Sequence, residues 1–230
     1  MNKLSIIIPV LNEISTIATT IAHLEKVLSK KIAYEIIIVD GGSIDGTIEK
    51  IKANDALKLV LSKKGRAKQM NAGANTASGD ILYFLHCDSF PPQDFDLAII
   101  SQVSQGNKAG CFRMEFNDNH PVLRLSQWFT RINHIAFRGG DQSLFVTTQL
   151  FQDIKGFNEE YVIYEDNDII SRLYAKKQFV VIPLTLFTSA RRYRQNGVWR
   201  LQYHFAMIHL KRKLGHSPEQ LLNYYKQNIL

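Results

Sequence analysis

Two acidic positions in this sequence have the residue types needed for metal binding and for proton transfer. Asp88 ends the run His86-Cys87-Asp88, which follows an apolar stretch at residues 81–85. Mg²⁺ commonly takes only one or two protein carboxylates, and water and phosphate oxygens complete its coordination. Asp166 follows Glu165 at the start of a segment with a helical pattern. The helix dipole favours negative charge there, so a helix cap explains this second pair as well as chemistry does.

A glycine-rich loop supplies a third candidate. Asp40-Gly41-Gly42-Ser43 follows the β-branched run at residues 35–39. Glycines allow tight turning and a close approach of backbone amides to a ligand, and Asp40 can accept hydrogen bonds from a base or a ribose. A plain turn from strand to helix explains the loop equally well. The loop lacks the ending of a nucleoside triphosphatase phosphate loop and the glycine pattern of dinucleotide-binding proteins.

The elements that must position these residues alternate along the first half of the chain. Apolar runs at residues 4–10, 35–39, 57–61 and 81–85 predict strands, and residues 14–28, 45–53 and 66–77 predict helices. This order favours a mostly parallel sheet with helices on both faces. Ligands of such sheets bind beyond the carboxyl ends of the strands. Asn12-Glu13, the Asp40 loop and His86-Cys87-Asp88 each follow a strand, so we expect them to converge on one edge.

The second half is less regular. We expect helices at residues 121–135 and after Asp166, a strand at residues 143–146, and two apolar runs at residues 179–182 and 184–187 around Pro183. A long helix is predicted at residues 195–214, and a short one starts at Pro218 with Ser217 as its N-cap. With 230 residues, 45% of them hydrophobic, the chain is long enough for one α/β domain.

Charge is distributed unevenly. Residues 1–168 hold 17 Lys and Arg against 20 Asp and Glu, whereas residues 169–218 hold ten basic residues and no acidic one. The basic part suits a phosphate-bearing ligand, an anionic membrane or nucleic acid. Cys87 and Cys111 have no metal-binding spacing and are too few for a disulfide framework, which favours a reducing cytoplasm. The sequence has neither a signal-peptide pattern nor an apolar run long enough to span a membrane.

Six segments together resemble the family 2 glycosyltransferases of the small soluble bacterial branch, which have the GT-A fold. They are SIIIPVLNE at residues 5–13, VDGGSIDGT at 39–47, GRAKQMNAG at 65–73, HCD at 86–88, GDQ at 140–142 and ED at 165–166. The resemblance implies an α/β fold with a mostly parallel central sheet flanked by helices and a helical C-terminal elaboration. It divides a single domain, residues 1–230, into a nucleotide-binding half at 1–90, an acceptor and catalytic half at 91–194, and C-terminal helices at 195–230.

The resemblance also implies an activity and its residues. A family 2 enzyme of this kind is an inverting transferase that moves a sugar from a nucleotide-diphospho-sugar, usually a uridine diphosphate sugar, to an acceptor hydroxyl. Asp88 matches the last aspartate of the family's DxD motif, which binds Mn²⁺ or Mg²⁺, and Asp166 matches the general base. His86 replaces the first aspartate; it could ligate Mn²⁺, although we expect a structural or hydrogen-bonding role. Glu165 and Asp141 are further catalytic candidates. The implied nucleotide-sugar contacts are Pro9, Asn12, Glu13, Asp40, Gly41, Gly42, Ser43, Arg66, Lys68, Arg191 and Arg192.

Rival functions and partners follow from the same features. A nucleotidyltransferase ordinarily has a glycine-rich, basic loop after its first strand, which Pro9 to Glu13 does not provide. A nucleic-acid-binding module would leave the acidic clusters without a purpose, so we expect no nucleic acid. A catalytically silent sugar-nucleotide binder stays open. In the helix predicted at 195–214, Val198, Leu201, Phe205 and Ile208 share one side, which favours docking on the core. The alternative is an interfacial helix on anionic lipid, which would suit a lipid-linked acceptor and a peripheral position on the inner face of the membrane.

Overall fold

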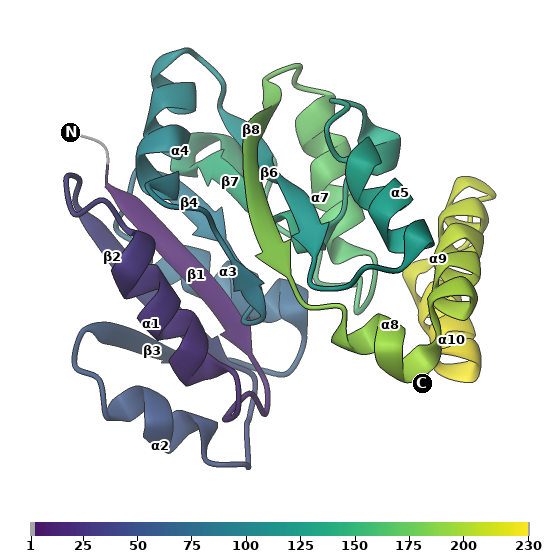
Figure 1. The fold of residues 1–230 in the computed structure, drawn as a ribbon, viewed down its shortest axis with the longest axis horizontal. Coiled ribbons are helices and arrows are strands. Elements are labelled where there is room, and N and C mark those ends of the chain that lie inside the picture. The colour runs from purple at the N-terminus through teal and green to yellow at the C-terminus, as the bar shows by residue number, and fades with distance from the viewer. Residues whose placement is uncertain (1–2, 230) are drawn as a thin grey trace.

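The computed structural model describes residues 3–229, and a single eight-stranded sheet runs through it (Figure 1). The order of strands is β3-β2-β1-β4-β7-β6-β8-β5. The strands are β1 Leu4–Val10, β2 Tyr34–Asp40, β3 Leu57–Leu61, β4 Ile81–Phe84, β5 Ser89–Phe90, β6 Ala109–Phe116, β7 Leu144–Thr147 and β8 Phe179–Thr188. The helices are α1 Ile17–Val27, α2 Thr47–Lys52, α3 Arg66–Thr76, α4 Phe95–Ser104, α5 Pro121–Phe129, α6 Thr148–Asp153, α7 Glu165–Tyr174, α8 Arg191–Asn196, α9 Val198–Lys213 and α10 Pro218–Asn228, with short 3-10 turns at η1 Ile135–Phe137 and η2 Gly140–Gln142.

The first half of the chain folds as predicted. Strand β1 pairs in parallel with β2 and β4, and β2 pairs in parallel with β3. Side chains of these strands bury on both faces, since Ile6 and Ile8 belong to one core cluster and Ile7 to another. The three expected helices also form, although α1 begins at Ile17 because residues 14–16 make a turn. A near-continuous apolar run is what a strand covered on both faces requires.

The second half of the sheet is mixed. Strand β7 pairs antiparallel with both β4 and β6, β8 pairs in parallel with β6, and β5 pairs antiparallel with β8. The two apolar runs around Pro183 form one strand, β8, whose register against β6 shifts between Phe112 and Arg113. Proline has no N–H to donate to a ladder, so an irregularity beside it is the expected accommodation. The parallel arrangement expected for the sheet therefore holds for β1 to β4.

The C-terminal helices differ from the prediction in one respect. A single helix over residues 195–214 was wrong, because the chain turns at Gly197, with φ of +80°, and separates α8 from α9. Glycine adopts this positive φ without the steric penalty of a side chain. Ser217 does cap α10, through a reciprocal pair of hydrogen bonds with Gln220. Helices α9 and α10 lie side by side at one end of the molecule (Figure 1), and none of the helices in residues 3–229 is both long and apolar enough to cross a membrane.

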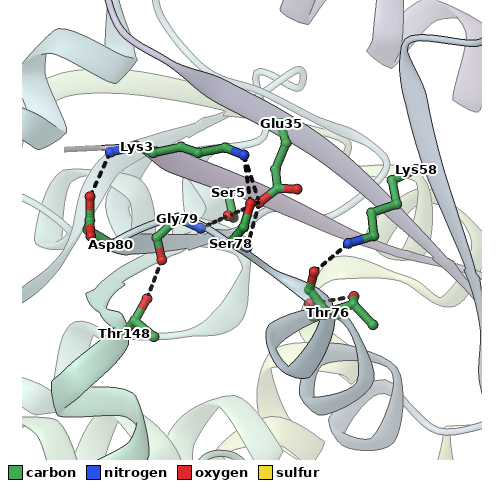
Figure 2. A network of polar contacts seen from close by, with 10 residues as sticks. Lys3, Ser5, Glu35, Lys58, Thr76, Ser78, Gly79, Asp80 and Thr148 are labelled. Carbon is green, nitrogen blue, oxygen red and sulfur yellow. Dashed lines mark hydrogen bonds and ion pairs between the residues drawn. The ribbon is translucent and has the colours of Figure 1, made fainter. Parts of the chain in front are cut away.

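A polar network ties the sheet together at the amino ends of β1 and β2 (Figure 2). Glu35 Oε1 accepts hydrogen bonds from Ser5 Oγ at 2.7 Å, Ser78 N at 2.7 Å and Ser78 Oγ at 2.8 Å, and lies 3.6 Å from Lys3 Nζ. Burial alone would raise the pKa of Glu35, but these donors and the Lys3 charge outweigh it and lower the pKa to about 2. The network joins β1, β2 and the segment leading into β4 on the side away from the loops that follow the strands.

Replacing Glu35 by glutamine tests this network. A carboxyl whose pKa is lowered on folding stabilises the protein above its ordinary pKa of 4.5, and that stabilisation is lost as the pH falls toward 2. We expect Glu35→Gln to lower the free energy of unfolding by roughly 2 kcal/mol at pH 7, allowing for solvent screening, and by less than half as much at pH 3. Urea unfolding at both pH values measures the difference. Glu25→Gln, at an exposed position on α1, is the control, and an equal loss at both pH values would contradict the ionic account.

Candidate active site

The loops that follow β1 and β2 are fastened to each other. Ser43 Oγ lies 2.8 Å from the amide nitrogen of Asn12, which donates to it, and Asn12 Oδ1 accepts from Ile44 N at 2.9 Å. Glu13 N donates to Thr47 Oγ1 at 2.9 Å. Asn12 has a φ of 55°, a left-handed conformation that asparagine tolerates better than most residues. Asn12 and Ser43 thus hold the two loops in place, while their predicted contacts with a nucleotide stay predictions.

Asp40 has a similar local role. Its side chain is fully buried, and Oδ1 accepts from Gly42 N at 2.7 Å and Ser43 N at 2.9 Å. Oδ2 is buried and has no hydrogen-bond partner in residues 3–229. A buried carboxylate oxygen without a partner is costly, and the predicted contact of Asp40 with a base or ribose stays a prediction. Gly42, with φ of +99°, makes the turn that brings its amide to Asp40.

Gln69 fixes the ends of the same two strands, and sequence reasoning did not identify it. Its Nε2 donates to the carbonyl oxygens of Val10 and Val39, both at 2.8 Å. A Cβ on Gly41 would lie only 2.9 Å from the Gln69 side chain. The glycine at position 41 therefore makes room for this brace. Lys68, one residue earlier on α3, does not line the pocket described next.

A pocket opens beyond the carboxyl ends of β1 and β4 and is closed on its far side by the C-terminal helices. It collects several of the predicted site residues from loops far apart in sequence: Pro9, Glu13, Arg66, His86, Asp88, Asp141, Arg191 and Arg192. The remaining lining residues are Cys87, Thr188, Ser189, Tyr193 and Phe205. Asn12, the loop at residues 40–43, Lys68, Glu165 and Asp166 do not line it. The predicted convergence at one edge therefore brings together the loops after β1 and β4, and the glycine-rich loop braces them from the side.

His86 lies between two carboxylates at the base of this pocket. Its Nδ1 is 3.6 Å from Asp141 Oδ1 and its Nε2 is 3.8 Å from Asp166 Oδ2. Burial and Arg66 lower the pKa of His86, but the two aspartates outweigh them and the net pKa is raised. Burial raises the pKa of Asp141, but His86, Arg66 and Arg192 together outweigh it, so the net pKa is lowered. Both ring nitrogens face carboxylates, at distances longer than a hydrogen bond, so the structural or hydrogen-bonding role expected for His86 stays a prediction.

Arg66 brings its guanidinium group to the same carboxylates. Its Nη1 lies 3.2 Å from Glu165 Oε1 and 3.7 Å from Asp166 Oδ2. The Glu165 side chain is almost completely buried, and burial, reinforced by the Asp166 charge and opposed by Arg66, raises its pKa to about 7. A buried carboxylate that faces another one needs such a cation. Glu165 is therefore a partner of Arg66 inside the wall and does not face the pocket.

The loop before β7 approaches Asp166 so closely that only glycine fits. A Cβ on Gly140 would lie 1.9 Å from Asp166 Oδ2. The loop is held by Arg138, which is buried and donates to the Gln142 side chain and to the carbonyls of Thr130 at 2.8 Å and Ile132 at 2.7 Å. Arg138 was not predicted, because a single arginine in a loop carries no pattern that distinguishes it from a solvated one.

Two arginines of α8 face the pocket from its C-terminal side. Arg191 Nη2 lies 3.3 Å from Glu13 Oε1, so an ion pair crosses from α8 to the loop after β1. The guanidinium of Arg192 lies 5.7 Å from the centre of the Phe205 ring and 5.8 Å from that of Tyr225. Phe205 was predicted on the core side of its helix; it is half-buried and also lines the pocket. Its position is set by the break at Gly197, which the sequence pattern did not reveal.

The residues present are compatible with a divalent metal, and Asp88, the predicted ligand, lines the pocket; its role as a ligand stays a prediction. No cluster of three or more His, Cys, Asp and Glu side chains within residues 3–229 could enclose an ion alone. Magnesium does not require one, because phosphate oxygens and water complete its coordination when one or two carboxylates bind it. Asp88 and Glu13 both line the pocket, and Glu13 Oε2 is buried without a partner. An ion beside a bound diphosphate would relieve that unpaired oxygen.

The fold is the GT-A fold of solved glycosyltransferases. A fragment of S. aureus TarS, solved in complex with UDP, superimposes with a TM-score of 0.66 at 19% identity, covering 82% of this chain and 60% of that one. GalNAc-T7, solved with UDP, GalNAc and Mn²⁺, gives 0.67 at 13% identity, covering 82% of this chain and 44% of that one. The sequence model of glycosyl transferase family 2 matches residues 5–164, and the chain belongs to this family.

A sequence relative agrees with this assignment. The undecaprenyl-phosphate 4-deoxy-4-formamido-L-arabinose transferase of Yersinia pestis is 35% identical over 116 residues, which is 46% of this chain and 35% of that protein. The chain spans about a third to a half of the length of the curated relatives that it matches first.

Substitution of Gly140 tests the contact that places Asp166. Because a Cβ at residue 140 would overlap the Asp166 carboxylate, we expect Gly140→Ala to lower the free energy of unfolding by about 1–3 kcal/mol and to displace Asp166. Gly139→Ala is a closely matched control, since a Cβ there meets no atom within 4 Å and the backbone is extended. Chemical denaturation of both variants gives the comparison. Equal stability of the two variants would show that the loop yields and does not position Asp166.

Proposed function

We propose that the protein is a metal-dependent, inverting glycosyltransferase that moves a sugar from a uridine diphosphate sugar to an acceptor hydroxyl. The observation that carries this proposal is the content of one pocket. A carboxylate suited to a metal, Asp88, and arginines suited to phosphate, Arg191 and Arg192, share it with Asp141. Asp166 lies directly behind, within 3.8 Å of His86. The reaction needs these two kinds of carboxylate, one for the leaving diphosphate and one for the proton.

Donor binding would use the positive side of the pocket. Guanidinium groups match phosphate oxygens in a planar, bidentate geometry. Arg191 is paired with Glu13 in the absence of ligand, and a diphosphate would compete for it. A contact of Asp40 with a base or ribose would need its loop to open, because Asp40 Oδ2 is buried and has no partner in residues 3–229. The UDP bound by TarS and GalNAc-T7 supports the choice of nucleotide for this chain.

A divalent ion, Mn²⁺ or Mg²⁺, held by Asp88 would neutralise charge on the leaving diphosphate. The protein's own residues would perform the proton transfer. Asp166 accepts the proton of the acceptor hydroxyl as its oxygen forms a bond to the anomeric carbon from the face opposite the leaving group. The bond from that carbon to the diphosphate oxygen breaks, and its electron pair leaves with the nucleotide. His86 and Arg66 hold Asp166 in place from two directions.

The proposed acceptor is based on the name of a relative and on the charge of the C-terminal part. The Yersinia pestis relative acts, by its name, with undecaprenyl phosphate, and the ten basic residues between 169 and 218 would suit an anionic surface. We therefore propose a lipid-linked acceptor and a cytoplasmic enzyme that meets it at the inner face of the membrane.

Nucleotide binding tests the donor and the metal together. We expect UDP with Mn²⁺ to raise the melting temperature more than either alone, since a ligand at 100 times its Kd adds about 2.7 kcal/mol to stability. Asp88→Asn should remove the part that depends on Mn²⁺. Asp94→Asn, at an exposed position outside the pocket, should behave as the parent. Differential scanning fluorimetry measures all three. No shift with any nucleotide would contradict the transferase proposal, and an unchanged metal effect in Asp88→Asn would contradict the metal assignment.

Asparagine at position 166 tests the base. Asparagine keeps the shape of aspartate but cannot accept the proton, so we expect kcat to fall by roughly 10²–10⁴ while the KM for the donor changes little. UDP release from a panel of UDP-sugars provides the assay. Asp168→Asn, on the same helix and paired with Arg172, should retain kcat. A larger loss in Asp141→Asn than in Asp166→Asn would instead make Asp141 the base.

A further inference from the structure

Helix α9 has apolar side chains on two opposite faces. One face is the expected one, where Leu201 and Ile208 are buried and Phe205 packs beside them against the third core cluster. A second set stands outward: Trp199, Tyr203, Ala206, Leu210 and Leu214, all exposed. Their spacings of four, three, four and four residues keep one face of a helix, at 3.6 residues per turn. We call these five residues the outer stripe.

The side chains of the outer stripe are exposed to solvent, and exposing apolar surface to water costs free energy. Trp199 is 72% exposed and Leu214, directly after the helix, is 70% exposed. The Trp199 ring has an edge contact with His120, whose ring centre is 6.4 Å away, at the start of α5. Helix α5 packs against α9 and carries a second exposed pair, Leu125 and Trp128. Contiguous exposed apolar surface of this kind marks interaction sites more often than chance.

Charge around the outer stripe narrows the choice of partner. Arg200 and Lys213 are both exposed and fall on either side of the stripe when α9 is viewed down its axis. Between residues 169 and 218 no acidic residue offsets them. An apolar stripe with a tryptophan, bordered by cations, is the pattern of helices that lie in the interface of an anionic bilayer. A protein partner of equal fit would need acidic side chains around an apolar groove.

The position of the stripe also relates to the candidate active site. A cleft lined by Ser126 and Phe129 of α5 and by Gln202 of α9 shares Asp141 and Tyr193 with the pocket. Its walls also include Met114, Phe116 and Phe137, which are apolar. The cleft therefore extends from the carboxylates toward the junction of α5 and α9, the same two helices that carry the exposed apolar side chains (Figure 1).

We infer that the outer stripe of α9 is a membrane-docking surface that seats the enzyme on an anionic bilayer, with the cleft between α5 and α9 turned toward acceptors held there. The choice of a lipid-linked acceptor rests on the proposed function, whereas binding of the bilayer does not. The stripe differs from the side of the helix that the sequence pattern marked as apolar. Tyr203 and Trp199 would lie at headgroup level, with Leu210 and Leu214 entering the acyl boundary.

Vesicle binding without donor or acceptor tests the surface directly. We expect the protein to sediment with vesicles of phosphatidylcholine mixed with phosphatidylglycerol, less with phosphatidylcholine alone, and less at high salt. The double variant Trp199→Ser with Leu214→Ser should bind about tenfold or more weakly. Leu61→Ser is the matched control. Leu61 is apolar and 68% exposed, and it lies on β3, an edge strand of the sheet that is remote from α9 (Figure 1). Lys213→Glu should weaken binding about tenfold, and Lys52→Glu on α2 should not.

Tryptophan fluorescence reports which face enters the bilayer. The chain has two tryptophans, Trp128 and Trp199, so Trp128→Phe leaves Trp199 as the only one. A blue shift of its emission on adding the anionic vesicles supports the inference. Three results would overturn it: no binding to anionic vesicles, binding that the stripe variants leave intact, or sedimentation velocity showing that the stripe joins two copies of the chain.

Vesicle binding and nucleotide binding test the docking surface and the proposed function separately. A protein that binds vesicles but shows no melting shift with nucleotides would keep the docking surface and lose the transferase proposal. A protein that binds UDP but ignores vesicles would do the reverse.

Discussion

The structure of the site depends on keeping four carboxylates close together. Asp88, Asp141, Glu165 and Asp166 all lie near enough to Arg66 to raise its pKa, although burial alone would lower it. Like charges at such distances repel strongly where water is partly excluded. Arg66 and the His86 ring lie among them, and Arg192 acts on Asp141 from the side of α8. Removing Arg66 would leave the buried Glu165 carboxylate without its cation. The arrangement is therefore stable only while helix α3, the loop after β4, the loop before β7 and helix α7 keep their positions.

The fold supplies those positions by different means in its two halves. In the first half, parallel strands covered on both faces end at one edge, so Glu13 and His86 arrive there through backbone register. In the second half, a mixed set of strands brings the loop of Gly140 back against α7, and the fit is steric, since no side chain longer than hydrogen can occupy residue 140 beside Asp166. The hydrogen bonds of Arg138 fix that loop from behind. Strand register in the first half and close packing in the second half thus position the same group of carboxylates.

The sequence predicts the first half of the fold well and the second half less completely. Strands β1 to β4 and helices α1 to α3 could be located because each carries a periodic apolar pattern and short connections. Strand β6 and helix α4 were not predicted, although polar residues flank both. Their apolar residues are interrupted by charged ones, Asp96 in α4 and Arg113 and Glu115 in β6, which weakens the apolar pattern. The break at Gly197 was missed because one glycine inside a helical pattern is usually tolerated. Phe205 and Gln69 could not be assigned, since their roles arise from neighbours far away in the chain.

His86 shows why a departure from a family motif needs the structure for its interpretation. By resemblance, residue 86 is an aspartate position, and a histidine there removes one negative charge next to Asp88. In the fold, Asp141 comes from a loop more than fifty residues later and lies 3.6 Å from His86 Nδ1. The imidazole therefore stands between Asp141 and Asp166 and links two carboxylates that would otherwise repel. If an aspartate occupied residue 86, three carboxylates would meet there without the imidazole between them, which is the reason that Asp141 and His86 are best understood as one paired feature of this chain.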